Sequence, residues 1–475
     1  GHMEAVSAAF ESILRDAPGL GLRLNVGKCE LICTGRTPPA SLNNLFPHEL
    51  LIDSVTGNSR VGLNGEFEFL GAPIGSAAFC GEHTASRARA CQTILNAIGK
   101  LDDPQVALKL LRSCAGFARL VYSMRVVPPS LHAGALLNFD AQVRACFEEF
   151  TGLSPTPKQW AQAGRSTRLA GLGLRSTSHH CEAAFLASAA ATQKLCREVD
   201  ANYSWDPSEA GGFAGSALAG LNAKLPADCA VRADILEDVS QGFLSDWLDS
   251  ADHKAFMVAL TTSQRAWIHS ELLKGASGFL NCTPSKVLGL SMGRAEFLTE
   301  VRSRLLMDAY SCDRFCPCCD SLLDRFGGHA RQCMAAGDTV ACHNAVRNYL
   351  GRFAQGASFS PSLEQAHLLP PRPEDNQAAN LRRPADIYIP SWKNGAPAAL
   401  DTAITSPLQQ GIVGQAALTS GAAAKAYEER KRAFLNTADL CAQQGILFVP
   451  LVAECTGGWG EDSLKALRHL AQAAA

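Results

Sequence analysis

The stretch that decides the fold of the carboxy-terminal part spans residues 382–409 and reads RRPADIYIPSWKNGAPAALDTAITSPLQ. It contains two short apolar runs bounded by turn-forming residues, a pattern that predicts two neighbouring buried β-strands. Asp386 opens the first run, and Asp401 interrupts the second. Because an unpaired carboxylate is costly to bury, each aspartate needs a partner. A divalent cation is a partner that two adjacent carboxylates can share.

The residues that follow predict a helix that brings basic side chains to this acidic pair. The segment KAYEERKRAF, residues 425–434, lies in a helix expected over residues 415–443. It offers two candidate lysines, Lys425 and Lys431, and we favour Lys431 because it stands three residues after Glu428. A strand, ILFVPLVAE, and a last helix from Asp462 are expected to complete the unit.

These residue types suit hydrolysis of a phosphodiester. A metal held by Asp386 and Asp401, either Mg²⁺ or Mn²⁺, lowers the pKa of a bound water and neutralises charge on the phosphate. Lys431 would orient the water, and Glu364, expected on a preceding helix, would complete the metal shell. For each aspartate alone, a solvated strand end or a turn cap is the ordinary alternative.

Cysteine and histidine crowd together between residues 311 and 343. The segment CPCCDSLLDRFGGHARQC places two residues between Cys316 and Cys319 and then adds His329 and Cys333. Three thiolates and one imidazole form a closed tetrahedral zinc site, which predicts a structural role. Buried free thiols are the alternative. Further candidate ligands lie nearby in the sequence: Cys312, Cys318, Cys342 and His343.

Composition sets broader limits on the protein. The 475 residues are 47% hydrophobic, enough for two to four domains with cores. The net charge of −2 indicates that any nucleic-acid surface is a local patch. The 18 cysteines are scattered, as in reduced intracellular proteins. Neither a secretion signal nor an apolar run of membrane-spanning length is found, so we expect no membrane association.

The amino-terminal part contains segments with the apolar spacing of a helix and segments with the alternation of a strand. A helix is expected over residues 4–18, and β-like segments follow around residues 22–35 and 65–75. Helices are expected between residues 82 and 152, with Asp102-Asp103-Pro104 as a cap and stop. A mostly helical region follows to residue 310.

Several segments, taken in order, resemble the carboxy-terminal part of the reverse transcriptases of non-LTR retrotransposons that carry a restriction-like endonuclease. GLRLNVGKCELI (21–32) and FEFLGAPIG (67–75) are similar to the last palm motifs, and LLRSCAGFARLVYSMRVVPPS (110–130) is similar to the thumb. The Cys/His segment and the two aspartates follow in the family's order. The match to the PD-(D/E)xK nuclease motif is not strict, since Ala403 stands where the motif has lysine, but in these elements the lysine lies on the following helix.

The resemblance implies a multidomain α+β protein with five segments. These are the end of the palm (4–75), a helical thumb (76–152), a helical linker (153–310), a zinc knuckle (311–343) and an α/β restriction-endonuclease-like domain (344–475). It implies a nuclear enzyme that nicks target DNA, whose free 3′ end primes reverse transcription of the element RNA. An RNA/DNA hybrid is then a further partner of the thumb and linker.

The same resemblance limits the chemistry. The polymerase motif with two adjacent aspartates after an aromatic residue is expected just before residue 4 and is not in this sequence. We therefore expect no polymerisation by this chain. The resemblance extends to the central scaffold protein of the spliceosome, so a catalytically inert nucleic-acid scaffold is the alternative function.

Five basic residues are candidates for nucleic-acid contacts. Lys28 matches the lysine of the palm motif, and Arg382 and Arg383 precede the first aspartate, where they would bind a scissile phosphate. Arg112 and Arg119 are seven residues apart and would share a face if one helix spanned them. Ordinary solvated arginines are the alternative for this last pair.

Overall fold

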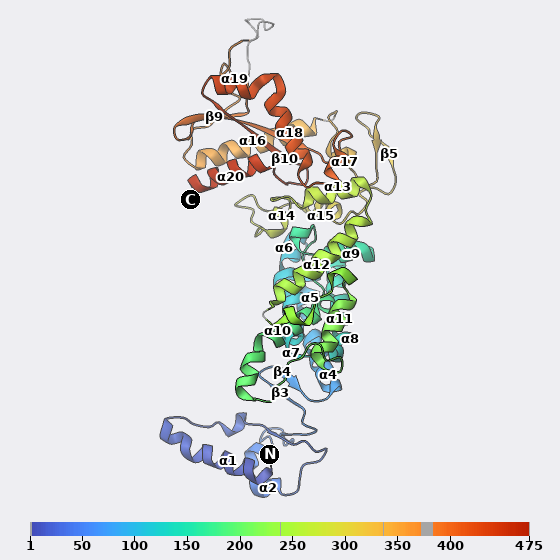
Figure 1. Cartoon of the computed structure of the whole chain (residues 1–475), viewed down its shortest axis with the longest axis vertical. Coiled ribbons are helices and arrows are strands. Elements are labelled where there is room, and N and C mark those ends of the chain that lie inside the picture. The colour runs from blue at the N-terminus through green and yellow to red at the C-terminus, as the bar shows by residue number, and fades with distance from the viewer. Residues whose placement is uncertain (1, 238, 336, 372–382, 475) are drawn as a thin grey trace. The chain divides into compact units, whose positions relative to one another are not determined.

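The computed structural model describes residues 2–237, 239–335, 337–371 and 383–474. The chain is a mixed α and β protein in which helices predominate and the sheets are small (Figure 1). It divides into two compact units, each made of three stretches of chain. The first comprises Gly1–Asn96, Cys114–Ala145 and Ser176–Leu248, and the second comprises Ala97–Ser113, Cys146–Arg175 and Asp249–Ala475. Among the described helices, none has both the length and the apolar character needed to cross a membrane.

The first unit begins with the expected helix, α1 (Met3–Asp16). Phe10 of α1 packs against a small core formed by Leu42, Phe46, Leu50 and Leu51. The β-like segment that follows was predicted too long. Only Leu31–Ile32 forms a strand, β1, which pairs in parallel with β2 (Val61–Gly62). Val26–Lys28 forms a 3₁₀ turn instead, because Asn25 and Gly27 interrupt the alternation that a strand needs.

The segment predicted as β-like at residues 65–75 forms a hairpin. β3 (Phe67–Phe69) pairs with β4 (Ala72–Ile74), and the turn has positive φ at Leu70 and Gly71. The Tyr122 hydroxyl donates a 2.7 Å hydrogen bond to the Leu70 carbonyl. Phe67 is partly buried, whereas Phe69 at the end of this short strand is 60% exposed.

The rest of the first unit is helical. α7 and α11 both pack against α10, whose amino-terminal turn is held by Asp140: this carboxylate accepts hydrogen bonds from the backbone N–H groups of Thr177 and Ser178. The helices within this unit are α4 (Ala77–Ala90), α7 (Val121–Val126), α10 (Thr177–Val199) and α11 (Phe213–Ala223). Three more have residues in both units: α5 (Gln92–Gly99), α8 (Pro129–Thr151) and α12 (Gln241–Val258).

The second unit also starts with helices. α6 (Pro104–Leu110) begins where predicted, because the Asp103 side chain accepts hydrogen bonds from the backbone N–H groups of Gln105 and Val106. Its other helices before the sheet are α9 (Pro157–Gly164), α13 (Thr262–Glu271), α14 (Gly278–Asn281) and α15 (Arg294–Arg304). A buried ion pair between Arg304 and Glu271 joins α15 to α13.

A four-stranded sheet forms the core of the second unit, in the order β10-β9-β8-β7. The three long strands occur where the sequence predicted them. β8 (Ile387–Lys393) and β9 (Ala396–Thr405) are antiparallel, and β10 (Leu447–Glu454) runs parallel to β9. β7 (Ser362–Leu363) is a short edge strand.

Helices cover both faces of this sheet (Figure 1). α16 (Asp338–Gly356) and α20 (Glu461–Ala474) pack on one face, against Ile387, Leu400 and Leu451. α18 (Ala422–Ala433) and α19 (Thr437–Gln443) pack on the other face, against Ala403 and Phe448. Along each strand, the side chains that face α16 and α20 alternate with those that face α18 and α19, because successive side chains point to opposite faces.

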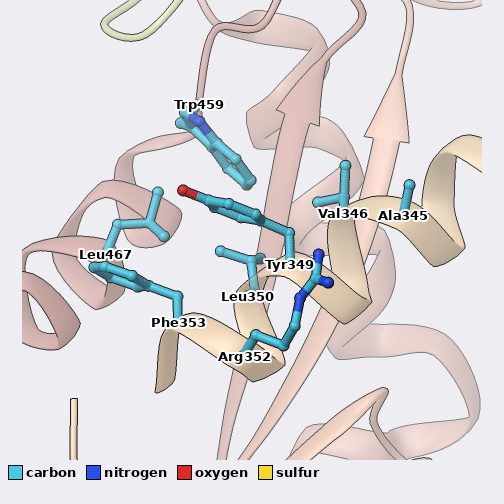
Figure 2. Close-up of a pocket in the computed structure, with 8 residues that line it drawn as sticks. All are labelled: Ala345, Val346, Tyr349, Leu350, Arg352, Phe353, Trp459 and Leu467. Carbon is cyan, nitrogen blue, oxygen red and sulfur yellow. The ribbon is translucent and has the colours of Figure 1, made fainter. Parts of the chain in front are cut away.

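Two tryptophans of this unit have packing roles. Trp392 is buried in the core beneath α16 and α20, and Trp459 packs against the same core. Trp459 also lines an apolar cavity of about 530 Å³ beside α16 and α20, with Tyr349 and Phe353 on its other sides (Figure 2).

The single helix predicted over residues 415–443 is divided into three: α17 (Val413–Ala416), α18 and α19. Gly421, with φ +79°, stands before α18, and Leu435 and Asn436, also with positive φ, separate α18 from α19. Residues in this left-handed conformation interrupt a right-handed helix. The break after Ala433 lets α18 and α19 each lie against the sheet.

Candidate metal centres and nucleic-acid contacts

Asp401 and Lys431 form an ion pair at the middle of the second unit. Asp401 lies within β9, and the Lys431 ammonium group of α18 is 2.9 Å from its Oδ2. The Asp401 side chain is only 15% exposed. Burial raises the pKa of this carboxyl to about 6, against the opposing effect of Lys431. Glu428, which guided the choice of lysine, is buried elsewhere and accepts a hydrogen bond from Ser463.

Asp386 stands directly before β8 and is held by the neighbouring strand. Its Oδ2 accepts a 2.7 Å hydrogen bond from the Thr402 backbone N–H and a second from the Thr402 hydroxyl. The same oxygen lies 3.1 Å from Nε2 of His343, which α16 supplies. Sequence reasoning missed His343 here, because its position beside Cys342 suggested only a spare zinc ligand.

The strand register makes the two aspartates neighbours. The antiparallel ladder pairs Ile387 of β8 with Leu400 of β9. Asp386 and Asp401 are the next residues beyond this pair, one on each side of the ladder. The negative charge of Asp386 raises the pKa of Asp401, as expected for nearby carboxylates. Their protein partners come from opposite faces of the sheet, since His343 belongs to α16 and Lys431 to α18.

The structure does not place Glu364 as expected. This residue follows the edge strand β7 with φ +50°, so the prediction of a preceding helix was wrong. Its carboxylate forms ion pairs with Arg347 and Arg383, and within the described residues it joins no group of three or more metal ligands with the aspartates. Lys425 is exposed on α18 and has no carboxylate partner in the described part of the chain.

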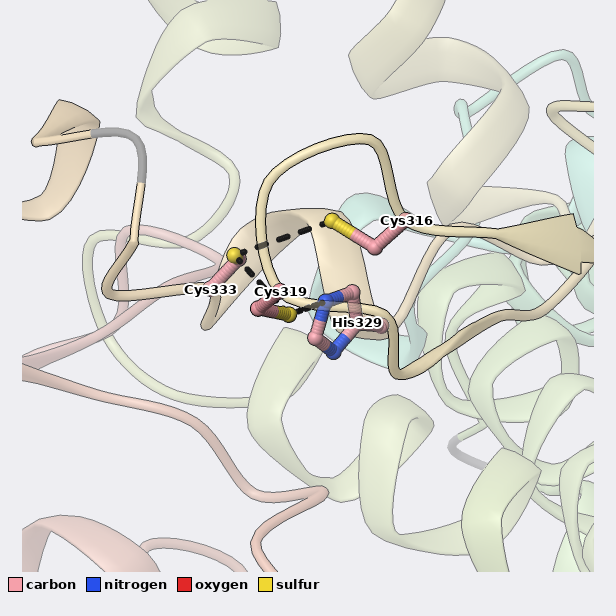
Figure 3. A group of neighbouring side chains, drawn as sticks. All are labelled: Cys316, Cys319, His329 and Cys333. Carbon is pink, nitrogen blue, oxygen red and sulfur yellow. Dashed lines mark hydrogen bonds between the residues drawn. The ribbon is translucent and has the colours of Figure 1, made fainter.

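Four side chains converge at the predicted zinc site (Figure 3). The ligand atoms of Cys316, Cys319, His329 and Cys333 all lie within 4.8 Å of one another. The Cys333 sulfur is 3.9 Å from that of Cys316 and 3.7 Å from that of Cys319. Thiolates bound tetrahedrally to zinc at about 2.3 Å are about 3.8 Å apart, so the spacing fits zinc.

Local structure favours the thiolate form of two of these three cysteines. Cys316 and Cys319 lie in the connection between β5 (Arg314–Phe315) and β6 (Leu322–Leu323), Cys316 at its start and Cys319 within its turn. Hydrogen bonds from Ser321 lower the pKa of Cys319 to about 6, and a backbone N–H of Cys318 lowers the pKa of Cys316. A lowered thiol pKa favours the thiolate, which is the form that binds zinc. The spare candidates Cys312, Cys318, Cys342 and His343 are not part of this cluster.

The arginine pair of the predicted thumb does not form a shared face. A π-turn at Leu111–Ala115 and the non-helical Gly116 end the helix between them, and the two residues belong to different compact units. The Arg112 guanidinium donates to the Leu280 carbonyl at 2.8 Å and to the Asn281 side chain, and burial lowers its pKa. The Arg119 guanidinium donates to the Cys114 carbonyl, so both arginines hold local backbone.

The other basic candidates differ in how accessible they are. Lys28 is exposed on its 3₁₀ turn. Arg383 is half exposed and pairs with Glu364. Arg382 lies outside the described residues. Their contacts with nucleic acid stay predictions.

Comparison with known proteins assigns no family to the chain. No family model matches the sequence, and no curated protein matches it.

Proposed function

We propose that this chain is a metal-dependent endonuclease that nicks DNA. The observation that supports this most strongly is the ammonium group of Lys431 at 2.9 Å from Asp401, with Asp386 at the adjoining position of the next strand. Two carboxylates and a lysine are the groups that phosphodiester hydrolysis with a divalent cation needs. The order of these residues is that of the nucleases which the sequence resembles.

The carboxylates keep ligand atoms available for a cation. In the described part of the chain, the contacts of Asp386 all use Oδ2, and Lys431 contacts Oδ2 of Asp401. Each aspartate therefore retains Oδ1 for Mg²⁺ or Mn²⁺, which would lower the pKa of a bound water and neutralise phosphate charge. Thr402 and His343 fix the orientation of Asp386, as residues around a metal ligand commonly do.

Lys431 has two roles in this proposal. Its positive charge favours the ionised form of Asp401, which burial opposes. Its ammonium group would also donate hydrogen bonds to a phosphate oxygen as negative charge develops there. By the resemblance, the nick would supply the primer for reverse transcription in the intact element, with structural zinc in the knuckle and element RNA as a further ligand.

A plasmid-nicking assay tests the proposal and separates the two candidate lysines. We expect the wild-type protein to nick supercoiled DNA with Mg²⁺ or Mn²⁺ and not with EDTA. Lys431→Met should lower the rate by about a hundredfold or more, because it removes one electrostatic stabiliser of the transition state. Lys425→Met should retain wild-type activity. Absence of nicking by the wild type with either cation would contradict the proposal.

Nicking should also depend on pH in a defined direction. The pKa of Asp401 is about 6, above the value of about 3.9 for an aspartate in an unfolded chain. Protonation prevents metal binding, so we expect the rate to fall about tenfold per pH unit below pH 6 and to level off above it. A higher Mg²⁺ concentration should move the pH at which the rate levels off to a lower value. Rate measurements from pH 5 to 8 would reveal this shift.

The stability of the fold should change in the opposite sense. A carboxyl whose pKa is raised on folding binds its proton more tightly in the folded state, so its contribution to stability grows as pH falls from about 6 to about 4. Thermal melting of wild type and Asp401→Asn at pH 5 and pH 7 isolates this contribution. An equal shift with pH in both proteins would show that Asp401 does not titrate in this range.

One observation favours the alternative, a catalytically inert nucleic-acid scaffold. Both aspartates already have partners within the protein, His343 for one and Lys431 for the other, on opposite faces of the sheet. Such pairs can stabilise a fold without a cation. This alternative predicts that the wild type retains DNA with salt-dependent affinity in a filter-binding assay but gives no nicks with any divalent cation.

A further inference from the structure

A cavity of about 700 Å³, lined by both polar and apolar side chains, adjoins the candidate catalytic residues within the second unit. Its walls come from the zinc segment, the start of α16, the end of β9 and α18. His343, Thr402 and Lys431 line it, so the cavity shares three residues with the carboxylate centre. A cavity of this size is in the range that holds a small-molecule ligand or one nucleotide.

The basic side chains in the cavity are not equivalent. Arg331 forms an ion pair with Glu300, donates to the Ser303 hydroxyl and lies over the Trp267 ring. Lys431 is paired with Asp401. Arg430 differs from both.

Arg430 is exposed on α18, and its guanidinium carbon lies 5.0 Å from the centre of the Tyr427 ring. Among the described residues no carboxylate pairs with it. A guanidinium held over an aromatic ring keeps its N–H donors directed outward, where they can bind a phosphate in bidentate geometry.

The remaining lining is mixed and includes the exposed carboxylate of Asp338 and the apolar side chains of Met334 and Val340. Hydroxyl and amide groups come from Thr405, Ser406 and Gln409 at the end of β9 and from Gln332 beside the zinc cluster. The thiol at the base, Cys455, has a pKa raised by burial to about 12, so it stays neutral and does not act as a nucleophile. The cavity therefore offers binding groups rather than a second reactive group.

We propose that this cavity binds one nucleotide of the DNA strand next to the phosphate that is cut, with Arg430 holding its phosphodiester group. The inference rests on the proposed nuclease function, because that function puts the scissile phosphate at Lys431, one residue along α18 from Arg430. Thr402 and His343 would then separate this nucleotide from the carboxylate centre.

DNA binding measured by fluorescence anisotropy without added Mg²⁺ or Mn²⁺ tests this inference without cutting and leaves the structural zinc in place. The probe is a short DNA duplex, and affinity is measured over a range of salt concentrations. Arg430→Ala should weaken binding about tenfold at low salt, as for loss of one charged hydrogen bond. It should also lower the slope of log affinity against log salt by about 0.9, the value for one phosphate contact. Arg430→Lys should keep the wild-type slope.

Arg352 supplies the matched control. It is another exposed arginine of the second unit, but it lines the apolar cavity of Figure 2 instead, so Arg352→Ala should leave both affinity and slope unchanged. Wild-type affinity and slope in Arg430→Ala would overturn the inference, as would equal losses in both alanine variants. An RNA duplex of the same sequence distinguishes the two sources of phosphodiester, and a loss confined to RNA would overturn the assignment to DNA.

The outcome is separable from that of the nicking assay. Nicking by the wild type together with normal binding by Arg430→Ala would leave the nuclease in place and remove only this subsite. A weakened, less salt-dependent Arg430→Ala in a protein that never nicks would support the phosphate contact and remove the nuclease.

Discussion

Asp401→Asn is expected to lower the rate of plasmid nicking by at least about a thousandfold, and Asp386→Asn should do the same. A neutral amide is a poor ligand for Mg²⁺, which prefers carboxylate and water oxygens. A thousandfold loss corresponds to about 4 kcal/mol of transition-state stabilisation, within the several kcal/mol that a bound metal supplies. Neither substitution changes the shape of the side chain, so packing in β9 and before β8 is preserved. Rates are measured with Mg²⁺ at pH 7.5 or above, where Asp401 is ionised.

Two controls guard against loss of the fold. Asp439→Asn changes an exposed aspartate of α19 in the same unit and should nick at the wild-type rate. Asp401→Asn leaves the Lys431 ammonium, whose side chain is 25% exposed, without its partner, so thermal melting of this variant is measured beside its activity. The double variant Asp401→Asn/Lys431→Met removes both charges and should fold but not nick. Nicking by the two single variants at the rate of the wild type would exclude the carboxylates from catalysis.

The strands of the second unit were predictable because their signals are local. The apolar runs around Tyr388 and Leu400 alternate with turn residues, and Asn394-Gly395 supplies the hairpin turn. The start of α6 was predictable for the same reason, since Asp103 caps it and Pro104 occupies its first position. The Cys/His cluster was predictable from spacing alone, because a tetrahedral site needs four ligands from a short segment.

The predictions that were wrong or incomplete concern mainly residues whose contacts are distant in sequence. His343 lies 43 residues before Asp386, and only the packing of α16 against β9 brings them together. Glu364 looked helical because SLEQAH contains good helix formers, but pairing of β7 with β8 decides its conformation. The pair Arg112 and Arg119 is an exception, because the helix ends locally at Gly116, between the two residues. For His343 and Glu364, local propensity is a weak prior because tertiary contacts override it.

Cys316→Ser is expected to abolish stoichiometric zinc binding and to unfold the segment around the cluster. This segment has almost no core of its own: its two strands have two residues each, and Phe315 and Met334 are 76% and 72% exposed. Without zinc, little apolar burial is left to offset the entropy of ordering the chain. Structural zinc sites bind with about 10–16 kcal/mol at neutral pH, which is enough to fold such a segment.

Cys318→Ser is the matched control, because Cys318 is an exposed neighbour that is not part of the cluster. Elemental analysis of freshly purified protein should give one zinc per chain for the wild type and Cys318→Ser and almost none for Cys316→Ser. Limited proteolysis should cut the Cys316→Ser chain between residues 312 and 335 while sparing the control. Because Arg331 and Gln332 of this segment line the cavity that Arg430 also lines, DNA affinity should fall with the zinc. Wild-type protein purified without zinc, yet resistant to protease in this segment, would show that the four side chains hold together without a metal.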